Sequence, residues 1–124
     1  METERPILVI EDHEDTRHMV QTALECDGFK TVGAPDGLRG LQALRQYRPC
    51  MILLDLSMPV MDGWKFRSEQ QHLSDPELAG VPVVVLSALL DCQEHGCNMG
   101  AADVIPKPID LDRMLRVVEA HCRH

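Results

Sequence analysis

The sequence predicts a single α/β domain built on a buried parallel β-sheet, and three observations support that prediction. Its 124 residues are enough for one compact core and too few for two. Hydrophobic residues make up 44% of the chain and charged residues 26%, close to the proportions of globular proteins. Short apolar runs alternate with amphipathic stretches five times, which is typical of βα units on a parallel sheet.

The first two βα units occupy the amino-terminal part of the chain. Residues 7–10 form an apolar run that predicts a strand, and a helix is expected from about Asp15 to the Asp27-Gly28 pair, because glycine is common where helices end. A weaker strand is expected at residues 30–34. The second helix should begin near Asp36, a suitable N-cap, and Pro49 should stop it.

The third unit contains the most apolar strand. Residues 50–54 are apolar on both faces, so we expect a central strand that runs directly into Asp55. A helix should follow from about Trp64. Residues 74–80 contain Ser, Asp, Pro and Gly and predict a long turn before the next strand.

The last two units complete the sheet. Residues 83–86 predict the fourth strand, which ends at Ser87, and a short helix is expected at residues 91–99, weakened by Gly96 inside it. A fifth strand around residues 104–105 leads into Pro106-Lys107-Pro108, and proline is tolerated on an edge strand. An amphipathic helix from Asp110 should close the fold.

Composition excludes several classes of protein. A formal net charge of −8 disfavours direct binding to nucleic acid, and no apolar stretch approaches the roughly 20 residues that span a bilayer. The acidic N-terminus differs from a signal peptide, so we expect a cytoplasmic protein without membrane contact. Five cysteines at irregular spacing are interpreted as ordinary thiols, and Cys92, His95 and Cys97 have no matching second pair of zinc ligands.

Polar residues follow four of the five predicted strands at the point where each strand ends. Glu11 and Asp12 follow the first strand, Asp55 the third, Ser87 the fourth and Lys107 the fifth. Because the carboxyl ends of parallel strands lie at one edge of a sheet, these side chains should converge there. Clustered carboxylates repel one another unless a cation is bound, and oxygen ligands of this kind suit Mg²⁺. Each residue alone could be a helix cap or a solvated charge; the set together favours a site.

These residues resemble the signature of response-regulator receiver domains of two-component signal transduction, over residues 6–121. The motifs that carry the resemblance are Glu11-Asp12, Asp55-Leu56-Ser57-Met58-Pro59 with Asp62-Gly63, Ser87-Ala88 and Lys107-Pro108. It implies a flavodoxin-like, chemotaxis-regulator-like fold: a doubly wound five-stranded parallel sheet in order 2-1-3-4-5 with five helices. Residues 1–124 would then be one receiver domain.

The resemblance also implies the chemistry. Asp55 would be the phosphoacceptor; Glu11, Asp12, Asp55 and the backbone carbonyl of Ser57 would hold Mg²⁺, with Glu11 acting through water. Ser87 and Lys107 would contact the phosphoryl oxygens, and Lys107-Pro108 would be a cis peptide. The phosphodonor would be a sensor histidine kinase or phosphotransfer protein, and the aspartyl phosphate would hydrolyse slowly, so the domain would not be an enzyme in the ordinary sense.

Output would be a switched protein-interaction surface formed by the fourth helix, fifth strand and fifth helix. Val104 stands where the family usually has Tyr or Phe, and residues 87–100 are about two residues shorter than usual. The main alternative is therefore a receiver-like interaction module that works without phosphorylation. We expect a stand-alone regulator rather than part of a kinase or transcription factor.

Two further classes fit less well. A hydrolase of the haloacid dehalogenase type would need a second acid where Ser57 stands and more chain for its cap. A flavodoxin-like cofactor binder would need a glycine-rich loop after the first strand, where residues 11–15 are instead mostly acidic.

Overall fold

The computed structural model describes residues 5–56, 60–87 and 100–122, which form an α/β domain around a five-stranded sheet. The strands are all parallel and lie in the order β2-β1-β3-β4-β5, which confirms the order expected from the resemblance. Their bounds are β1 (Ile7–Ile10), β2 (Thr31–Ala34), β3 (Met51–Asp55), β4 (Val83–Ser87) and β5 (Asp103–Pro106).

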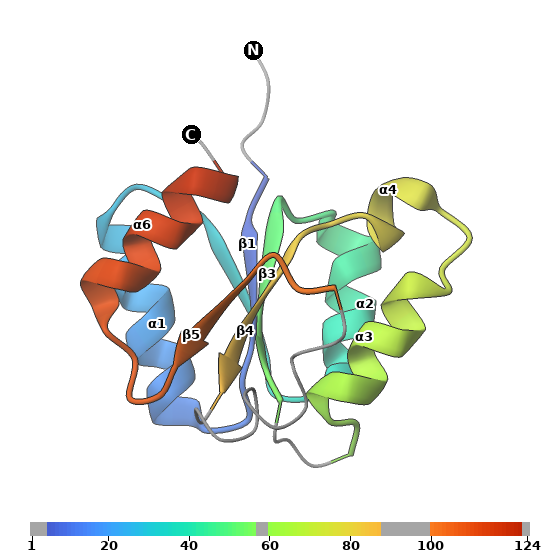
Figure 1. Ribbon diagram of the computed structural model, residues 1–124, viewed down its shortest axis with the longest axis horizontal. Helices are drawn as coiled ribbons and strands as arrows, with labels where there is room; N and C mark the ends of the chain where they lie inside the picture. Colours follow the sequence, from blue (N-terminus) through green and yellow to red (C-terminus); the bar gives the residue numbers. More distant parts are fainter. Residues whose placement is uncertain (1–4, 57–59, 88–99, 123–124) are drawn as a thin grey trace.

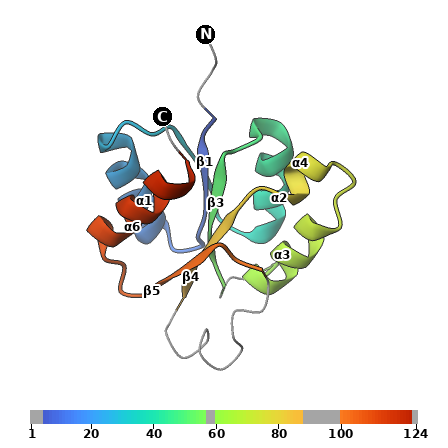
Figure 2. The same ribbon diagram turned by 45° about the horizontal axis from the view of Figure 1, so that its top comes forward.

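Helices cover both faces of the sheet, as Figures 1 and 2 show. One face is covered by α1 (Glu14–Cys26) and α6 (Leu111–His121), and the other by α2 (Gly37–Tyr47), α3 (Gly63–Gln71) and the single turn α4 (Pro76–Ala79). This is the doubly wound arrangement that parallel strands with helical crossovers require. None of the helices in the described ranges is long and apolar enough to cross a membrane.

The three middle strands are fully buried because helices pack on both sides of them. Every residue of β1, β3 and β4 is buried, and two apolar clusters result, one on each face of the sheet. The cluster under α2 and α3 centres on Phe66, and the cluster under α1 and α6 includes Val20, Leu24 and Met114. Burial on this scale holds the strand ends, and therefore the polar residues that follow them, in a rigid frame.

Most helices begin where an aspartate accepts hydrogen bonds from the first turn. Asp36 accepts from the N–H of Arg39, and Asp62, Asp75 and Asp110 act in the same way for α3, α4 and α6. The first helix begins at a less common cap, the imidazole of His13, which accepts from the N–H of Thr16. At the other end of α1, Gly28 has a φ of 94°, which explains the glycine expected there.

The segment before β4 contains a helical turn that the sequence did not predict. The predicted long turn at residues 74–80 is wrong in part, because Asp75 caps a helical turn whose first residue is Pro76. The helix expected at residues 91–99 lies outside the described residues.

The expectation that all cysteines are ordinary thiols is wrong. Cys50 and Cys122 form a disulfide, with their Cα atoms 5.8 Å apart and a sequence separation of 72. Cys26 is a free, exposed thiol, and Cys92 and Cys97 lie outside the described residues. Spacing did not reveal the pair because the two residues meet only through the packing of α6 beside β3.

Candidate functional site

The candidate site lies at the edge of the sheet where the strands end. In the pairing register, Ile10 of β1 is opposite Leu54 of β3, so Glu11 follows beside Asp55. On the other side of β3, Asp55 is opposite Leu86, and Ser87 follows it. Four strands thus place the expected polar residues at one edge, as the sequence predicted.

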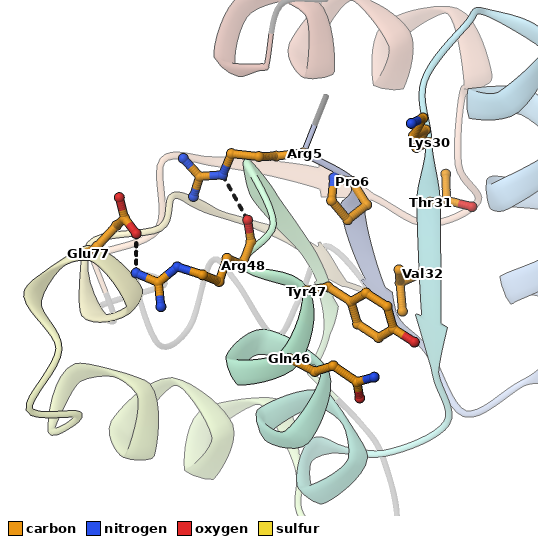
Figure 3. Close-up of a pocket in the computed structure, with 9 residues that line it drawn as sticks. All are labelled: Arg5, Pro6, Lys30, Thr31, Val32, Gln46, Tyr47, Arg48 and Glu77. Atoms are coloured by element: carbon orange, nitrogen blue, oxygen red, sulfur yellow. Dashed lines mark hydrogen bonds and ion pairs between the residues drawn. The ribbon is translucent and has the colours of Figure 1, made fainter. Parts of the chain in front are cut away.

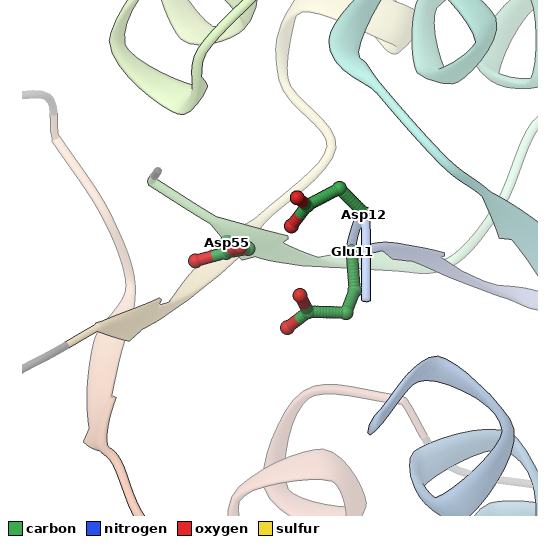
Figure 4. Close-up of side chains that lie close together, drawn as sticks. All are labelled: Glu11, Asp12 and Asp55. Atoms are coloured by element: carbon green, nitrogen blue, oxygen red, sulfur yellow. The ribbon is translucent and has the colours of Figure 1, made fainter. Parts of the chain in front are cut away.

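Three carboxylates meet at this edge. One oxygen from each of Glu11, Asp12 and Asp55 can be chosen so that all three lie within 4.8 Å of one another. Figure 4 shows the side chains of Glu11 and Asp12 directed toward the space beside Asp55. Glu11 and Asp55 are buried, whereas Asp12 is exposed. The cluster therefore has a solvent-facing side through which an ion or substrate can enter.

One cation approaches the cluster from β5. The Nζ of Lys107 lies 3.2 Å from Oε1 of Glu11 and 3.2 Å from Oδ1 of Asp55, and the lysine side chain remains 34% exposed. Lys107 is placed by its own backbone N–H, which donates to the carbonyl of Ser87, and the Lys107–Pro108 peptide is cis as expected. Three carboxylates against one ammonium leave a formal charge of −2 at the site.

Burial and neighbouring charges together shift the pKa values of Glu11 and Lys107. Burial raises the pKa of Glu11 above its ordinary value of 4.5, and the Asp55 carboxylate raises it further, although the N–H of His13 and the Lys107 ammonium oppose the rise. Burial acts to lower the pKa of Lys107, but attraction to Asp55 and Glu11 outweighs it and raises the pKa above 10.5. Among the described carboxylates and the Lys107 ammonium, negative charge is in excess, which is the condition that a divalent cation relieves.

Glu11 is held by contacts that the sequence did not suggest. The backbone N–H of His13 donates to its carboxylate, and Arg17 Nη1 donates to its carbonyl oxygen at 2.9 Å. Its own N–H donates to Ala34 of β2. The Arg17 contact crosses from the second turn of α1 to the end of β1, and only the packed arrangement reveals it.

Ser87 and Ser57 are the two remaining residues of the predicted site. Ser87 ends β4 and is 2% exposed, next to the Asp55 strand. Ser57 lies outside the described residues, so its expected carbonyl ligand is untested. The donor set that is described, carboxylates at the end of a sheet with an open side, fits a hard cation such as Mg²⁺.

The start of α3 packs unusually close to the end of β3. A Cβ atom on Gly63 would lie 2.7 Å from the carbonyl oxygen of Asp55 and 2.7 Å from the Cα of Leu56. The Gly63 N–H donates to Leu56 at 2.9 Å. The Asp62-Gly63 pair thus combines a helix cap with a close approach to the backbone that carries Asp55, and only glycine allows both.

A large hollow of about 620 Å³ lies elsewhere, at the edge where β1 and β2 begin. Figure 3 shows Arg5 reaching the carbonyl of Arg48, and the Arg48 guanidinium pairing with Glu77. The guanidinium groups of Arg5 and Arg48, which line this hollow, are thus both bonded to other groups of the protein. The hollow lies at the opposite ends of the strands from the carboxylates and is therefore remote from the acidic site.

Comparison with known proteins agrees with this geometry. The family described as "Response regulator receiver domain" matches residues 7–119. The transcriptional regulatory protein CseB of Streptomyces avermitilis is 41% identical over 106 residues, which are 84% of this chain and 43% of that protein. The "DNA-binding dual master transcriptional regulator RpaA" of Synechocystis is 36% identical over 119 residues, 94% of this chain and 48% of that protein. The chain spans about half the length of these curated relatives.

Solved structures show the same fold. The receiver domain of the Francisella response regulator 1452 has a TM-score of 0.82 at 25% identity, covering 94% of this chain and 95% of that one. The receiver domain of a sensor histidine kinase from Pseudomonas aeruginosa, with a magnesium ion coordinated in its active-site cleft, has a TM-score of 0.86 at 23% identity, covering 96% and 98%.

The family match covers the whole described sheet and includes each strand end that contributes to the acidic site. Receiver domains are phosphoacceptor signalling modules rather than classical enzymes. On this evidence, the chain belongs to the response regulator receiver domain family.

Proposed function

We propose that Asp55 is the phosphoacceptor of this chain, and that Glu11, Asp12 and Asp55, with the backbone carbonyl of Ser57, hold the Mg²⁺ ion that the reaction needs. The observation that supports this most is the meeting of three carboxylates and the Lys107 ammonium at the end of a buried parallel sheet. Bound Mg²⁺ would supply charge neutralisation for the incoming phosphoryl group.

Asp55 acts as a carboxylate nucleophile in this proposal. One of its oxygens forms a bond to phosphorus while the bond from phosphorus to the donor breaks, giving an aspartyl phosphate. Asp55 is 3% exposed and ends a strand buried on both faces, so its side chain is held in one position. Such positioning is the main contribution that a protein makes to phosphoryl transfer.

Lys107 and Ser87 contact the transferred group. The Lys107 ammonium already lies 3.2 Å from Asp55, and the new phosphoryl oxygens would give it a stronger partner than the carboxylate alone. Ser87, beside Asp55 in the sheet, would donate its hydroxyl to another oxygen. Because Lys107 and Ser87 are joined by a backbone hydrogen bond, movement of one would be passed to the other.

The phosphodonor in this proposal is a sensor histidine kinase or a phosphotransfer protein, as is general for the family. The output is a change in a protein-binding surface to which β5 and α6 belong, together with the fourth helix that the family resemblance implies, whose expected residues 91–99 lie outside the described part of the chain. We further propose that residues 1–124 form one receiver domain that works in the cytoplasm and makes no direct contact with nucleic acid, given its net charge of −8. Slow hydrolysis of the aspartyl phosphate would end the signal.

A second candidate is an interaction module that works without phosphorylation. The observation that favours it is Val104, a half-buried residue of β5 that has no ring to move between buried and exposed positions. In that case the acidic site would bind Mg²⁺, but partner binding would not depend on Asp55.

The experiment that tests the proposal is intact-mass analysis after incubation with acetyl phosphate and Mg²⁺. We expect one added phosphoryl group that is lost in Asp55→Ala and in the presence of a chelator. Asp112→Asn, in the exposed first turn of α6, is the matched control and should be phosphorylated like the wild type. Absence of the adduct from folded wild-type protein would reject the proposal and leave the interaction module.

A further inference from the structure

A covalent link joins two elements at the edge of the sheet where the strands begin, which we call the basal edge. Cys50 stands directly before β3, Cys122 stands directly after α6, and the two form a disulfide. Their Cα separation of 5.8 Å lies within the usual range for such bonds. Figure 1 shows that the carboxyl end of α6 and the amino end of β3 reach the same edge of the molecule.

The same two elements are also joined at the opposite edge. Strand β3 runs from Cys50 to Asp55, and α6 begins a few residues after Lys107, which pairs with Asp55. Helix α6 is therefore connected to β3 at both ends, by the disulfide at the basal edge and through the ion pair of Lys107 beside the candidate site. Phosphorylation of Asp55 would alter only the second connection.

We propose that Cys50 and Cys122 form a reversible thiol–disulfide site that reacts with low-molecular-weight thiols and disulfides, and that its oxidised form restrains α6 when Asp55 is phosphorylated. The restraint of α6 rests on the proposed function, because it concerns the response to a phosphoryl group. The redox site itself is independent of the proposed function.

The surroundings of the two sulfurs determine which one reacts. Cys50 is partly exposed, whereas Cys122 is 6% exposed and belongs to the apolar cluster under α1 and α6. An external thiolate reaches Cys50 and bonds to its sulfur, while the disulfide bond breaks and its electron pair leaves on the Cys122 sulfur, which takes a proton from water. A second external thiolate then attacks the external sulfur of this mixed disulfide and releases Cys50, which is protonated in turn. The protein gains two electrons and two protons, and the two external thiols leave as a disulfide.

The reduced form can keep its fold. A cysteine thiol is a small apolar side chain, so Cys122 can remain in the core cluster after the bond breaks. In the disulfide-bonded structure the N–H of Cys122 donates to Val118 at 2.8 Å and α6 buries Met114 and Val118, and none of these contacts needs the bond between the sulfurs. Only the covalent restraint on the last turn is lost, which permits repeated oxidation and reduction.

The redox site is tested by equilibrating the whole chain in glutathione buffers of different oxidation state, then alkylating it and measuring intact and peptide masses. In oxidising buffer we expect Cys50 and Cys122 to be linked and Cys26 to be alkylated; reducing buffer should add two alkyl groups, and reoxidation should remove them. Cys26→Ser should keep this difference of two groups, and Cys50→Ser should abolish it. A bond that millimolar glutathione does not open in the folded protein would overturn reversibility, and pairing of Cys50 with another cysteine would overturn the site.

The restraint is tested by hydrogen exchange of α6 in both redox forms, before and after reaction with acetyl phosphate and Mg²⁺. Phosphorylation should accelerate exchange at residues 117–121 at least about tenfold more in the reduced than in the oxidised protein, while α2 on the other face should change less. Equal changes in both forms would overturn the restraint. If neither form takes up a phosphoryl group, the proposed function fails, whereas the alkylation result stands separately.

Discussion

Substituting Asp12 by asparagine tests whether the acidic cluster destabilises the protein in the absence of a cation. The change removes one of three negative charges and keeps nearly the same side-chain shape. Asp12 is the exposed member of the cluster, so the partly buried ion pairs of Lys107 with Glu11 and Asp55 remain in place. We expect Asp12→Asn to be more stable than the wild type in a chelating buffer.

The magnitude follows from the distances in the cluster. Carboxylate oxygens within 4.8 Å repel one another by about 0.9 kcal/mol at the dielectric constant of water and about 3.5 kcal/mol at an effective value near 20. Exposure of Asp12 favours the lower part of this range, and attraction to Lys107 offsets part of the two repulsions. The net gain in unfolding free energy should be about 1–2 kcal/mol, or about 3–8 °C in Tm for a domain of this size.

The assay is urea unfolding of both proteins, with a chelator and with millimolar Mg²⁺. Mg²⁺ should stabilise the wild type, because an ion that binds only the folded state adds its binding free energy to stability. Asp12→Asn should lose most of that gain, since one metal ligand is missing. The two proteins should therefore differ most in the chelating buffer, and the difference should shrink or reverse with Mg²⁺.

Glu119→Gln is the matched control, because it removes the same charge from an exposed position near the carboxyl end of α6, where a negative charge opposes the helix dipole. It should change stability by only a few tenths of a kcal/mol and leave the response to Mg²⁺ intact. The reasoning is refuted if Asp12→Asn is no more stable than the wild type without Mg²⁺, or if Mg²⁺ stabilises both proteins equally.

Three further predictions follow from the site. The pKa of Glu11 is raised in the folded protein, so its contribution to stability is fully present below pH 4.5 and is lost as the pH rises through the folded pKa. In chelator, the unfolding free energy of Glu11→Gln relative to the wild type should therefore increase from pH 4.5 toward neutrality. A difference in urea unfolding that does not change with pH would contradict this prediction. Gly63→Ala should lose about 1–3 kcal/mol, because its Cβ would lie 2.7 Å from backbone atoms of Asp55 and Leu56; an unchanged urea midpoint would show that α3 can shift freely. Val60 is 79% exposed at a φ of 67°, so Val60→Gly should raise stability by about 1 kcal/mol in the same assay, and a loss would mean that Val60 makes a contact that outweighs the backbone strain.

Local patterns in the sequence were sufficient for most of the fold. The apolar runs of β1, β3 and β4 are buried on both faces, and Asp36 lies at a helix start as predicted because capping depends on neighbouring residues alone. The polar residues after the strands converge for an equally simple reason, since parallel strands end at one edge. The turn α4 was missed because a single helical turn has too few residues for a periodic pattern.

By itself, then, the sequence determined the alternation of strands and helices and the placing of polar residues at the strand ends, because both depend on short-range patterning and on the geometry of parallel sheets. Tertiary structure alone decided which groups bond across long stretches of chain. Cys50 meets Cys122, 72 positions further along the chain, and Arg48 pairs with Glu77, 29 positions further along. Such contacts depend on how helices pack against the sheet, and no spacing rule within the chain contains that information.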